Sequence, residues 1–135
     1  MRALLSLAAL SAIWLTGCTQ SSEGGTPGTK ASFKIEGPVT GETIKQGEQD
    51  TIDLSINRGS DFKKDVKLTA EAPDSKIKAE LNKTMVKASE DTKFNMTVSV
   101  AKDAPIGDHI VKVTGTPEGG GSPTHLDVKI KVDKP

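Results

Sequence analysis

The sequence predicts an all-β fold, a two-sheet antiparallel sandwich of about seven short strands. From residue 32 onward, apolar and polar residues alternate with a period of two, which places one face of each strand on a core and the other in water. Clusters of Gly, Pro, Asn and Asp separate these stretches and are typical of turns. No window of a dozen residues in this region shows the 3.6-residue period of a helix.

The expected strands follow one another with one apolar face each. From residue 32 onward the aromatic residues are Phe33, Phe62 and Phe94, so aliphatic side chains must fill most of the core. The residues that we expect to face inward are, in chain order, Phe33 and Ile35; Ile44; Ile52, Leu54 and Ile56; Val66, Leu68 and Ala70; Ile77, Ala79 and Leu81; Phe94, Met96, Val98 and Val100; Val111, Val113 and Gly115; and Leu126, Val128, Ile130 and Val132.

An apolar run precedes this region. It follows Met1-Arg2 and extends from Ala3 to Leu15, which is 13 residues. As a helix it would reach about 20 Å, whereas the hydrocarbon core of a bilayer is about 30 Å thick. The run is therefore too short for a comfortable membrane span and has the length of the apolar part of a secretory signal peptide.

The residues that end this run, Leu15-Thr16-Gly17-Cys18, resemble the lipobox of bacterial lipoproteins. The resemblance implies transfer of a diacylglyceryl group to the thiol of Cys18, cleavage between Gly17 and Cys18, and often acylation of the new amino group. Two or more acyl chains give a durable hold on a membrane, whereas one is reversible. It also implies a place in the bacterial cell envelope. In lipoproteins of bacteria with two membranes, Asp directly after the lipidated cysteine signals retention in the inner membrane. This chain has Thr19 there, which favours the outer membrane if the host has two membranes.

Three regions follow from these observations. Residues 1–17 are expected to be a lipoprotein signal peptide, residues 18–31 the lipidated cysteine and a flexible tether, and residues 32–135 the sandwich domain. The tether is rich in Ser, Thr and Gly and lacks an apolar period. A free chain of this length spans about 20 Å on average and about 43 Å at full extension. Because Cys18 is the sole cysteine, no disulfide within the chain can staple the core.

The order of short signals in residues 32–133 resembles the immunoglobulin-like sandwich repeats of bacterial exported proteins, the NEW3-like domains. Ala104-Pro105-Ile106-Gly107-Asp108-His109 resembles the family's Ala-Pro-x-Gly-x-Tyr step, and Val113-Thr114-Gly115-Thr116 its Val-Thr-Gly-Thr strand. The resemblance implies an immunoglobulin-like topology. His109 stands where the family has a Tyr that bonds back to upstream backbone, so we expect it to act as a structural corner.

Composition and motifs exclude several functions. The chain has 18 basic and 18 acidic residues, which gives no basic face for nucleic acid and no polybasic membrane patch. The two histidines, His109 and His125, have only Asp108 and Asp127 nearby in sequence, so we expect no metal site. No Ser sits in a nucleophile elbow, and we expect no catalytic residues, no enzyme activity and no small-molecule cofactor.

The function that these features favour is a membrane-anchored, non-catalytic module for envelope structure or protein–protein contact. Its expected partners are the membrane, through lipid on Cys18, and an envelope protein. The alternative is an accessory surface module that binds a polysaccharide or a small ligand, although the mature region lacks the Trp and Tyr on which sugars usually stack. An enzyme is the third hypothesis. Lysines on the middle and last strands are interpreted as protection of sheet edges against aggregation.

Overall fold

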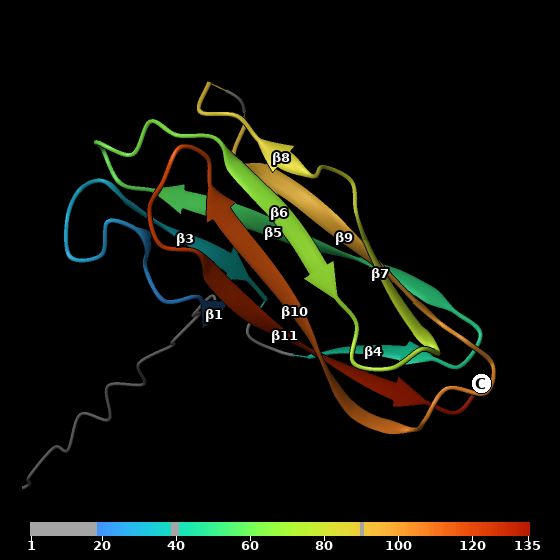
Figure 1. Ribbon diagram of the computed structural model, residues 1–135. Coiled ribbons are helices and arrows are strands. Elements are labelled where there is room, and N and C mark those ends of the chain that lie inside the picture. Colours follow the sequence, from blue (N-terminus) through green and yellow to red (C-terminus); the bar gives the residue numbers. More distant parts are fainter. Residues whose placement is uncertain (1–18, 39–40, 90) are drawn as a thin grey trace, which may run out of the picture.

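The computed structural model describes residues 19–38, 41–89 and 91–135, and these form two β-sheets stacked face to face (Figure 1). The first sheet has the strand order β1-β3-β5-β9-β7, with β2 also paired to β3, and the second has the order β4-β11-β10-β6-β8. The strands are β1 (Thr19–Gln20), β2 (Gly24–Gly25), β3 (Ser32–Gly37), β4 (Glu42–Lys45), β5 (Gln49–Arg58), β6 (Val66–Glu71), β7 (Ile77–Leu81), β8 (Met85–Val86), β9 (Lys93–Val100), β10 (Gly107–Pro117) and β11 (Thr124–Asp133). The prediction of an all-β sandwich is confirmed.

The described residues contain eleven strands rather than about seven, and three of them (β1, β2 and β8) are only two residues long. Such short strands carry too few residues for an alternating pattern to reveal them. The pairing also differs in one place from the expected antiparallel arrangement, because β4 runs parallel to β11. Alternation reports which face of a strand is buried and carries no information about the direction of its neighbour.

The core lies between the sheets and consists of the residues that the alternation predicts. The apolar side chains of β5, β9 and β11 are buried at every second position. Phe62, Val86 and Ala104 join them from outside the long strands. Ala70, Ala79 and Leu81 are only partly buried. The last two lie on β7, whose position at the edge of the first sheet leaves one side without a neighbouring strand.

The segment expected to be a flexible tether is structured from Thr19 onward. β1 pairs antiparallel with β3, where Thr19 lies opposite Gly37, and β2 pairs with the other end of β3, where Gly24 lies opposite Phe33. The folded domain therefore begins before residue 32. The physical reason is that β3 would otherwise present an open edge, and backbone N–H and C=O groups of any sequence can satisfy it. The expected signal peptide, residues 1–17, and Cys18 lie outside the described residues.

In the part of the chain that the structure describes, no helix is long and apolar enough to cross a membrane.

Candidate functional site

The feature closest to the expected anchor is the segment of residues 19–31, which we call the N-terminal strap. Ser21 holds it to the middle of β3 by two hydrogen bonds. The backbone N–H of Ser21 donates to the carbonyl oxygen of Ile35 over 2.8 Å, and the N–H of Ile35 donates to Oγ of Ser21, also over 2.8 Å. Both residues are buried, so each bond satisfies a group that water does not reach.

The strap also reaches the second sheet. Oγ1 of Thr124, on β11, donates to the carbonyl oxygen of Ser22 over 2.7 Å and lies 3.0 Å from its Oγ. Further along, Gly25 and Ser122 exchange two backbone hydrogen bonds of 2.7 and 2.8 Å. Because β3 belongs to one sheet and β11 to the other, the strap closes the side of the sandwich between them. We call this side the β3–β11 seam.

Two glycines let the strap lie directly on aromatic side chains. A Cβ at Gly24 would stand 2.7 Å from the Phe33 ring and 2.9 Å from the carbonyl oxygen of Ser122. A Cβ at Gly25 would meet the ring of Phe62 at 3.1 Å. Distances below 3.0 Å require the neighbouring atoms to move. A Cβ at Gly25 would also stand 2.7 Å from the carbonyl oxygen of Ala31, so the strap requires glycine at both positions.

The turn of the strap, residues 26–31, is fastened by its own hydrogen bonds. The N–H of Thr26 donates to the carbonyl oxygen of Ala31 over 3.0 Å, and Oγ1 of Thr29 donates to the carbonyl oxygen of Thr26 over 2.7 Å. The carboxylate of Glu23 accepts a 2.6 Å hydrogen bond from the N–H of Gly28. These contacts define one conformation for a sequence that has no apolar period.

The expected lipidation site, Cys18, and the expected cleavage site between Gly17 and Cys18 lie outside the described residues. Both stay predictions. What the structure adds is the position of the next residue, because Thr19 is already paired with Gly37 on β3.

His109, the expected structural corner, lies near the start of β10. Its Nε2 is 2.8 Å from the carbonyl oxygen of Pro105, four residues upstream. A carbonyl oxygen only accepts, so this hydrogen bond requires the tautomer with a proton on Nε2. The ring therefore bonds back to upstream backbone, the geometry that a corner needs. We predict that this hydrogen bond stabilises the corner.

The structure does not bring the two histidines together. His109 lies opposite Ile130 in the β10–β11 ladder, whereas His125 lies opposite Thr114, five pairs away. Their positions in the alternation also put them on opposite faces of the sheet. Among the described residues, no three His, Cys, Asp or Glu side chains are placed to hold a metal ion.

Two groups of charged side chains have pKa values that their surroundings shift. Nζ of Lys76 lies 2.6 Å from Oδ2 of Asp103 at the surface. This hydrogen bond lowers the pKa of Asp103 and raises the pKa of Lys76. Partial burial lowers the pKa of Arg58, and the nearby Asp65 opposes that shift.

Arg58 is a residue whose role the sequence does not reveal. It ends β5 in the first sheet, yet its guanidinium donates to the carbonyl oxygens of Val86 and Lys87 over 3.2 and 2.8 Å. Val86 belongs to β8 in the second sheet, so one side chain links the two layers. In the sequence Arg58 stands at the start of a Gly-Ser-Asp turn and resembles an ordinary loop residue.

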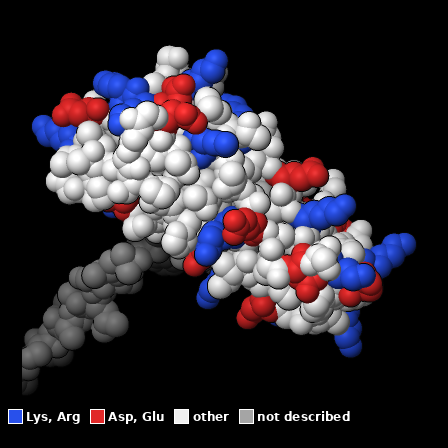
Figure 2. All heavy atoms as spheres, viewed as in Figure 1, with Lys and Arg blue, Asp and Glu red and all other residues white. Residues whose placement is uncertain are grey.

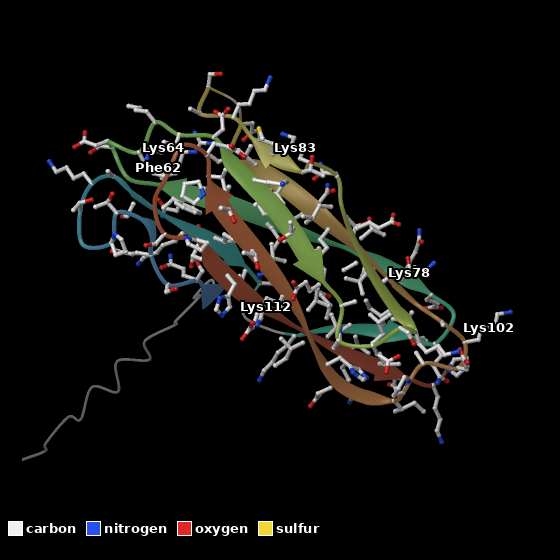
Figure 3. The ribbon with its side chains drawn as sticks, viewed as in Figure 1. Phe62, Lys64, Lys78, Lys83, Lys102 and Lys112 are labelled. Atoms are coloured by element: carbon white, nitrogen blue, oxygen red, sulfur yellow. The ribbon has the colours of Figure 1, made fainter. Side chains whose placement is uncertain are left out.

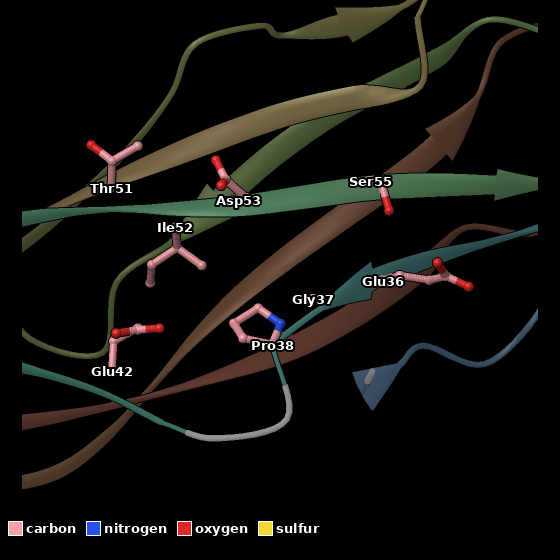
Figure 4. A pocket seen from close by; sticks show the side chains of 8 residues that line it. All are labelled: Glu36, Gly37, Pro38, Glu42, Thr51, Ile52, Asp53 and Ser55. Atoms are coloured by element: carbon pink, nitrogen blue, oxygen red, sulfur yellow. The ribbon is translucent and has the colours of Figure 1, made fainter. Parts of the chain in front are cut away.

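Two open hollows lie on either side of β5. One, of about 380 Å³, is lined by Glu36, Gly37, Pro38, Glu42, Thr51, Ile52, Asp53 and Ser55 (Figure 4). The other, of about 450 Å³, shares Asp53 and Ser55 and adds Asn82 and Asn95. Hydroxyl and carboxylate groups line both, and the second also has the side-chain amides of Asn82 and Asn95 and the ammonium groups of Lys83 and Lys93. Such groups can hydrogen-bond a polar ligand.

The lysines are dispersed among acidic side chains and do not form one basic face in the view of Figure 2. Lys78 lies on β7, an edge strand, as the interpretation of edge protection requires. Lys129 and Lys131 lie on β11, which has a partner strand on both sides, so edge protection does not explain them.

Comparisons with known proteins show similarity in structure but not in sequence. No family model matches it, and no curated protein matches it in sequence. Among solved structures it resembles domains 4 and 5 of the S-layer protein SbsC, with a TM-score of 0.52, 11% identity, and coverage of 73% of this chain and 50% of that one. It also resembles part of a family 123 glycoside hydrolase from Clostridium perfringens, with a TM-score of 0.53, 11% identity and coverage of 71% and 23%.

The chain thus spans half of the S-layer fragment and about a quarter of the hydrolase that it matches. At this identity the similarity shows an all-β domain and nothing about activity.

Proposed function

We propose that the processed chain is a lipid-anchored protein of the bacterial cell envelope whose single domain is non-catalytic and serves envelope structure or protein–protein contact. The observation that carries this proposal is the position of the lipobox. Cys18 is followed at once by Thr19, the first residue of β1, so a predicted anchor and a folded domain adjoin with nothing between them. Display of this one domain at a membrane is the function that such a chain supports best.

We also propose that the domain is immunoglobulin-like in topology. One sheet carries β3, β5, β9 and β7 in that order, and the other carries β4, β11, β10 and β6. We take β3 and β4 as two halves of strand A and label β5, β6, β7, β9, β10 and β11 as strands B to G. The first sheet then has the order A-B-E-D and the second contains G-F-C, as in immunoglobulin domains. The position of His109 at the start of β10, the F strand in this labelling, supports the same assignment.

Two further observations favour a non-catalytic role at the cell surface. His109 and His125 are far apart on opposite sheet faces, so neither serves the other in a catalytic set. An S-layer protein is among the structures that the chain resembles, which agrees with a place at the cell surface. The outer membrane is the proposed location if the host has two membranes.

The second candidate function is an accessory module that binds a polysaccharide or a small polar ligand. The two hollows that share Asp53 and Ser55 favour it, because both present hydroxyl and carboxylate groups and the second adds side-chain amides. Retention of the protein on immobilised envelope polysaccharide, lost in Asp53→Ala, would support this function. Equal retention of both proteins would argue against these hollows as the binding site.

The leading proposal is tested by labelling cells that make the full chain with a radioactive or clickable fatty acid. We expect label on the wild-type protein and none on Cys18→Ser, because Cys18 offers the sole thiol. The mutant should also keep its uncut leader and migrate more slowly on a gel. Label that persists in Cys18→Ser would overturn the anchor. Crosslinking in native membranes followed by purification then identifies the envelope partner.

A further inference from the structure

We infer that the N-terminal strap joins the lipid anchor to the domain as a docked strand, so that the β1 edge of the first sheet lies against the lipid bilayer. This inference rests on the proposed lipidation of Cys18. It names the surface that faces the membrane, which is formed by Gln20 on β1 with Lys34 and Glu36 on β3. The partner of this surface is the headgroup layer.

The short length of chain between the lipid and the domain places the β1 edge near the membrane. Only Cys18 separates the acyl chains from Thr19, which is paired with Gly37. One residue spans at most about 3.6 Å, whereas a free strap of 13 residues would span about 20 Å on average. With the strap docked, the acyl chains enter the bilayer within a few ångströms of the β1 edge.

The contacts that fasten the strap carry the second step. If the strap left, the buried N–H of Ile35 would lose the Oγ of Ser21, and the buried hydroxyl of Thr124 would lose the carbonyl oxygen of Ser22. Leaving such groups without partners is costly. Departure would also uncover the ring of Phe33, on which Gly24 lies. The docked strap is therefore part of the closed core.

The strand order then fixes which side of the domain points away from the membrane. In the first sheet β7 is at the opposite edge from β1, four strand spacings or about 19 Å away. Lys78 marks that far edge (Figure 3). Near the β1 edge, the carboxylate of Glu36 accepts a hydrogen bond from Gln20, and Lys34 lies beside it on β3. These few opposite charges give no strong pull toward anionic lipid, so the acyl chains supply the hold.

The experiment uses the processed chain, residues 18–135, coupled through its sole thiol to a maleimide-headgroup phospholipid in phosphatidylcholine vesicles. This region has no Trp and no Tyr, so one introduced Trp reports one position. Lys34→Trp places it at the inferred membrane edge and Lys78→Trp at the far edge. Vesicles with a nitroxide-labelled headgroup quench each Trp according to its distance from the bilayer surface.

We expect the Lys34→Trp fluorescence to be quenched several-fold more than that of Lys78→Trp. Adding Gly24→Val, whose side chain cannot fit beside Phe33 and the Ser122 carbonyl oxygen, should release the strap and bring the two values together. Gly28→Asn is the matched control, because it adds a side chain where nothing lies within 4 Å and Asn tolerates the left-handed backbone. It should keep the difference. Equal quenching of the two Trp positions with the native strap would overturn the inference.

Gly24→Val could unfold the domain, and circular dichroism will show whether it does. A second variant then replaces it, with a Gly/Ser spacer of about ten residues between Cys18 and Thr19, which adds roughly 16–19 Å of average reach. The spacer should lower the Lys34→Trp quenching while the domain stays folded, and unchanged quenching would overturn the inference. Because the lipid is attached chemically, a failure here is distinct from a failure of fatty-acid labelling in cells.

Discussion

The rings of Phe33 and Phe62 lie 4.8 Å apart between centroids, with their planes inclined by 33°. Phe33 belongs to β3 and Phe62 follows β5, so the pair ties the start of the first sheet to the loop that leads to the second. The guanidinium carbon of Arg58 lies 6.0 Å from the centre of the Phe62 ring. With the strap glycines on one side and this cation on another, two of the three phenylalanines of the mature region make one closed cluster.

Replacing Phe62 should therefore be among the more damaging single changes. The side chain is 4% exposed, so Phe62→Ala opens a cavity beside Phe33 and should lower the free energy of unfolding by about 3–5 kcal/mol. Phe62→Leu should cost clearly less because it refills part of the volume. Urea denaturation measures both. Ile106→Ala is the control, since Ile106 is 52% exposed and its loss should change stability by less than about 0.5 kcal/mol. A Phe62→Ala protein as stable as this control would contradict the packing described here.

Ser21→Ala tests whether the strap belongs to the fold. It removes the oxygen that accepts from the buried N–H of Ile35 and should lower the free energy of unfolding by about 1–3 kcal/mol. Hydrogen exchange should show faster exchange of the Ile35 amide. Ser75→Ala, at an exposed serine in a turn, should leave both measurements unchanged. Identical behaviour of the two variants would mean that the strap does not stabilise the domain.

His109→Phe tests the corner. It keeps an aromatic ring but loses the donor to the carbonyl oxygen of Pro105, and we expect a loss of about 0.5–1.5 kcal/mol in urea denaturation. His109→Tyr restores a donor at the position where the resembled family carries Tyr, and it should recover part of that loss. Nitrogen NMR of the wild type should show the proton on Nε2. Equal stability of all three proteins would show that the bond contributes nothing.

The Lys76–Asp103 pair predicts a small pH effect with a defined sign. Because the pKa of Asp103 is lowered in the folded state, its contribution to stability is present above the ordinary carboxylate pKa and is lost as the pH falls through the folded value. The raised pKa of Lys76 gives the opposite dependence, a contribution lost only at strongly alkaline pH. Asp103→Asn should therefore lower the melting temperature slightly at pH 7 and have no effect once the carboxyl is protonated.

Both side chains of this pair are exposed, so salt should screen the effect at pH 7, since the Debye length falls from about 10 Å at 0.1 M to about 3 Å at 1 M. Asp108→Asn, another exposed carboxylate, serves as the control. A difference between Asp103→Asn and this control that persists at high salt would point to packing rather than charge.

The sequence reveals the parts of this fold that depend on side chains facing a core. β9, with Phe94, Met96, Val98 and Val100 buried in turn, follows the predicted alternation residue for residue. The strap escapes such analysis because its hydrogen bonds come mostly from backbone atoms and its key residue, Gly24, has no side chain. The parallel pairing of β4 with β11 cannot be predicted either, because the alternation of buried and exposed residues is the same for a parallel and an antiparallel neighbour. The contacts of Arg58 with the carbonyl oxygens of Val86 and Lys87 cannot be predicted from the sequence, because they depend on how the two sheets stack.

At the candidate site, too, a local sequence motif can be predicted whereas contacts between distant segments cannot. The residues that resemble a lipobox are consecutive, so the expected lipidation site, Cys18, can be predicted from the sequence alone. The contacts of the strap cannot be predicted in this way, because Gly37 and Thr124 are brought to it by pairing between segments far apart in the chain. A reach calculated from composition alone treats residues 19–31 as free, and only the pairing with β3 shows that they are not.

The docked strap also bears on solubility. A β3 strand without β1 and β2 would present a row of unpaired backbone groups beside Phe33 and Ile35, which is the kind of exposed edge through which chains add to one another and aggregate. Residues 19–25 cover that edge from within the same molecule. The few residues next to the predicted cleavage point therefore also protect the protein from joining edge to edge with neighbouring copies of itself.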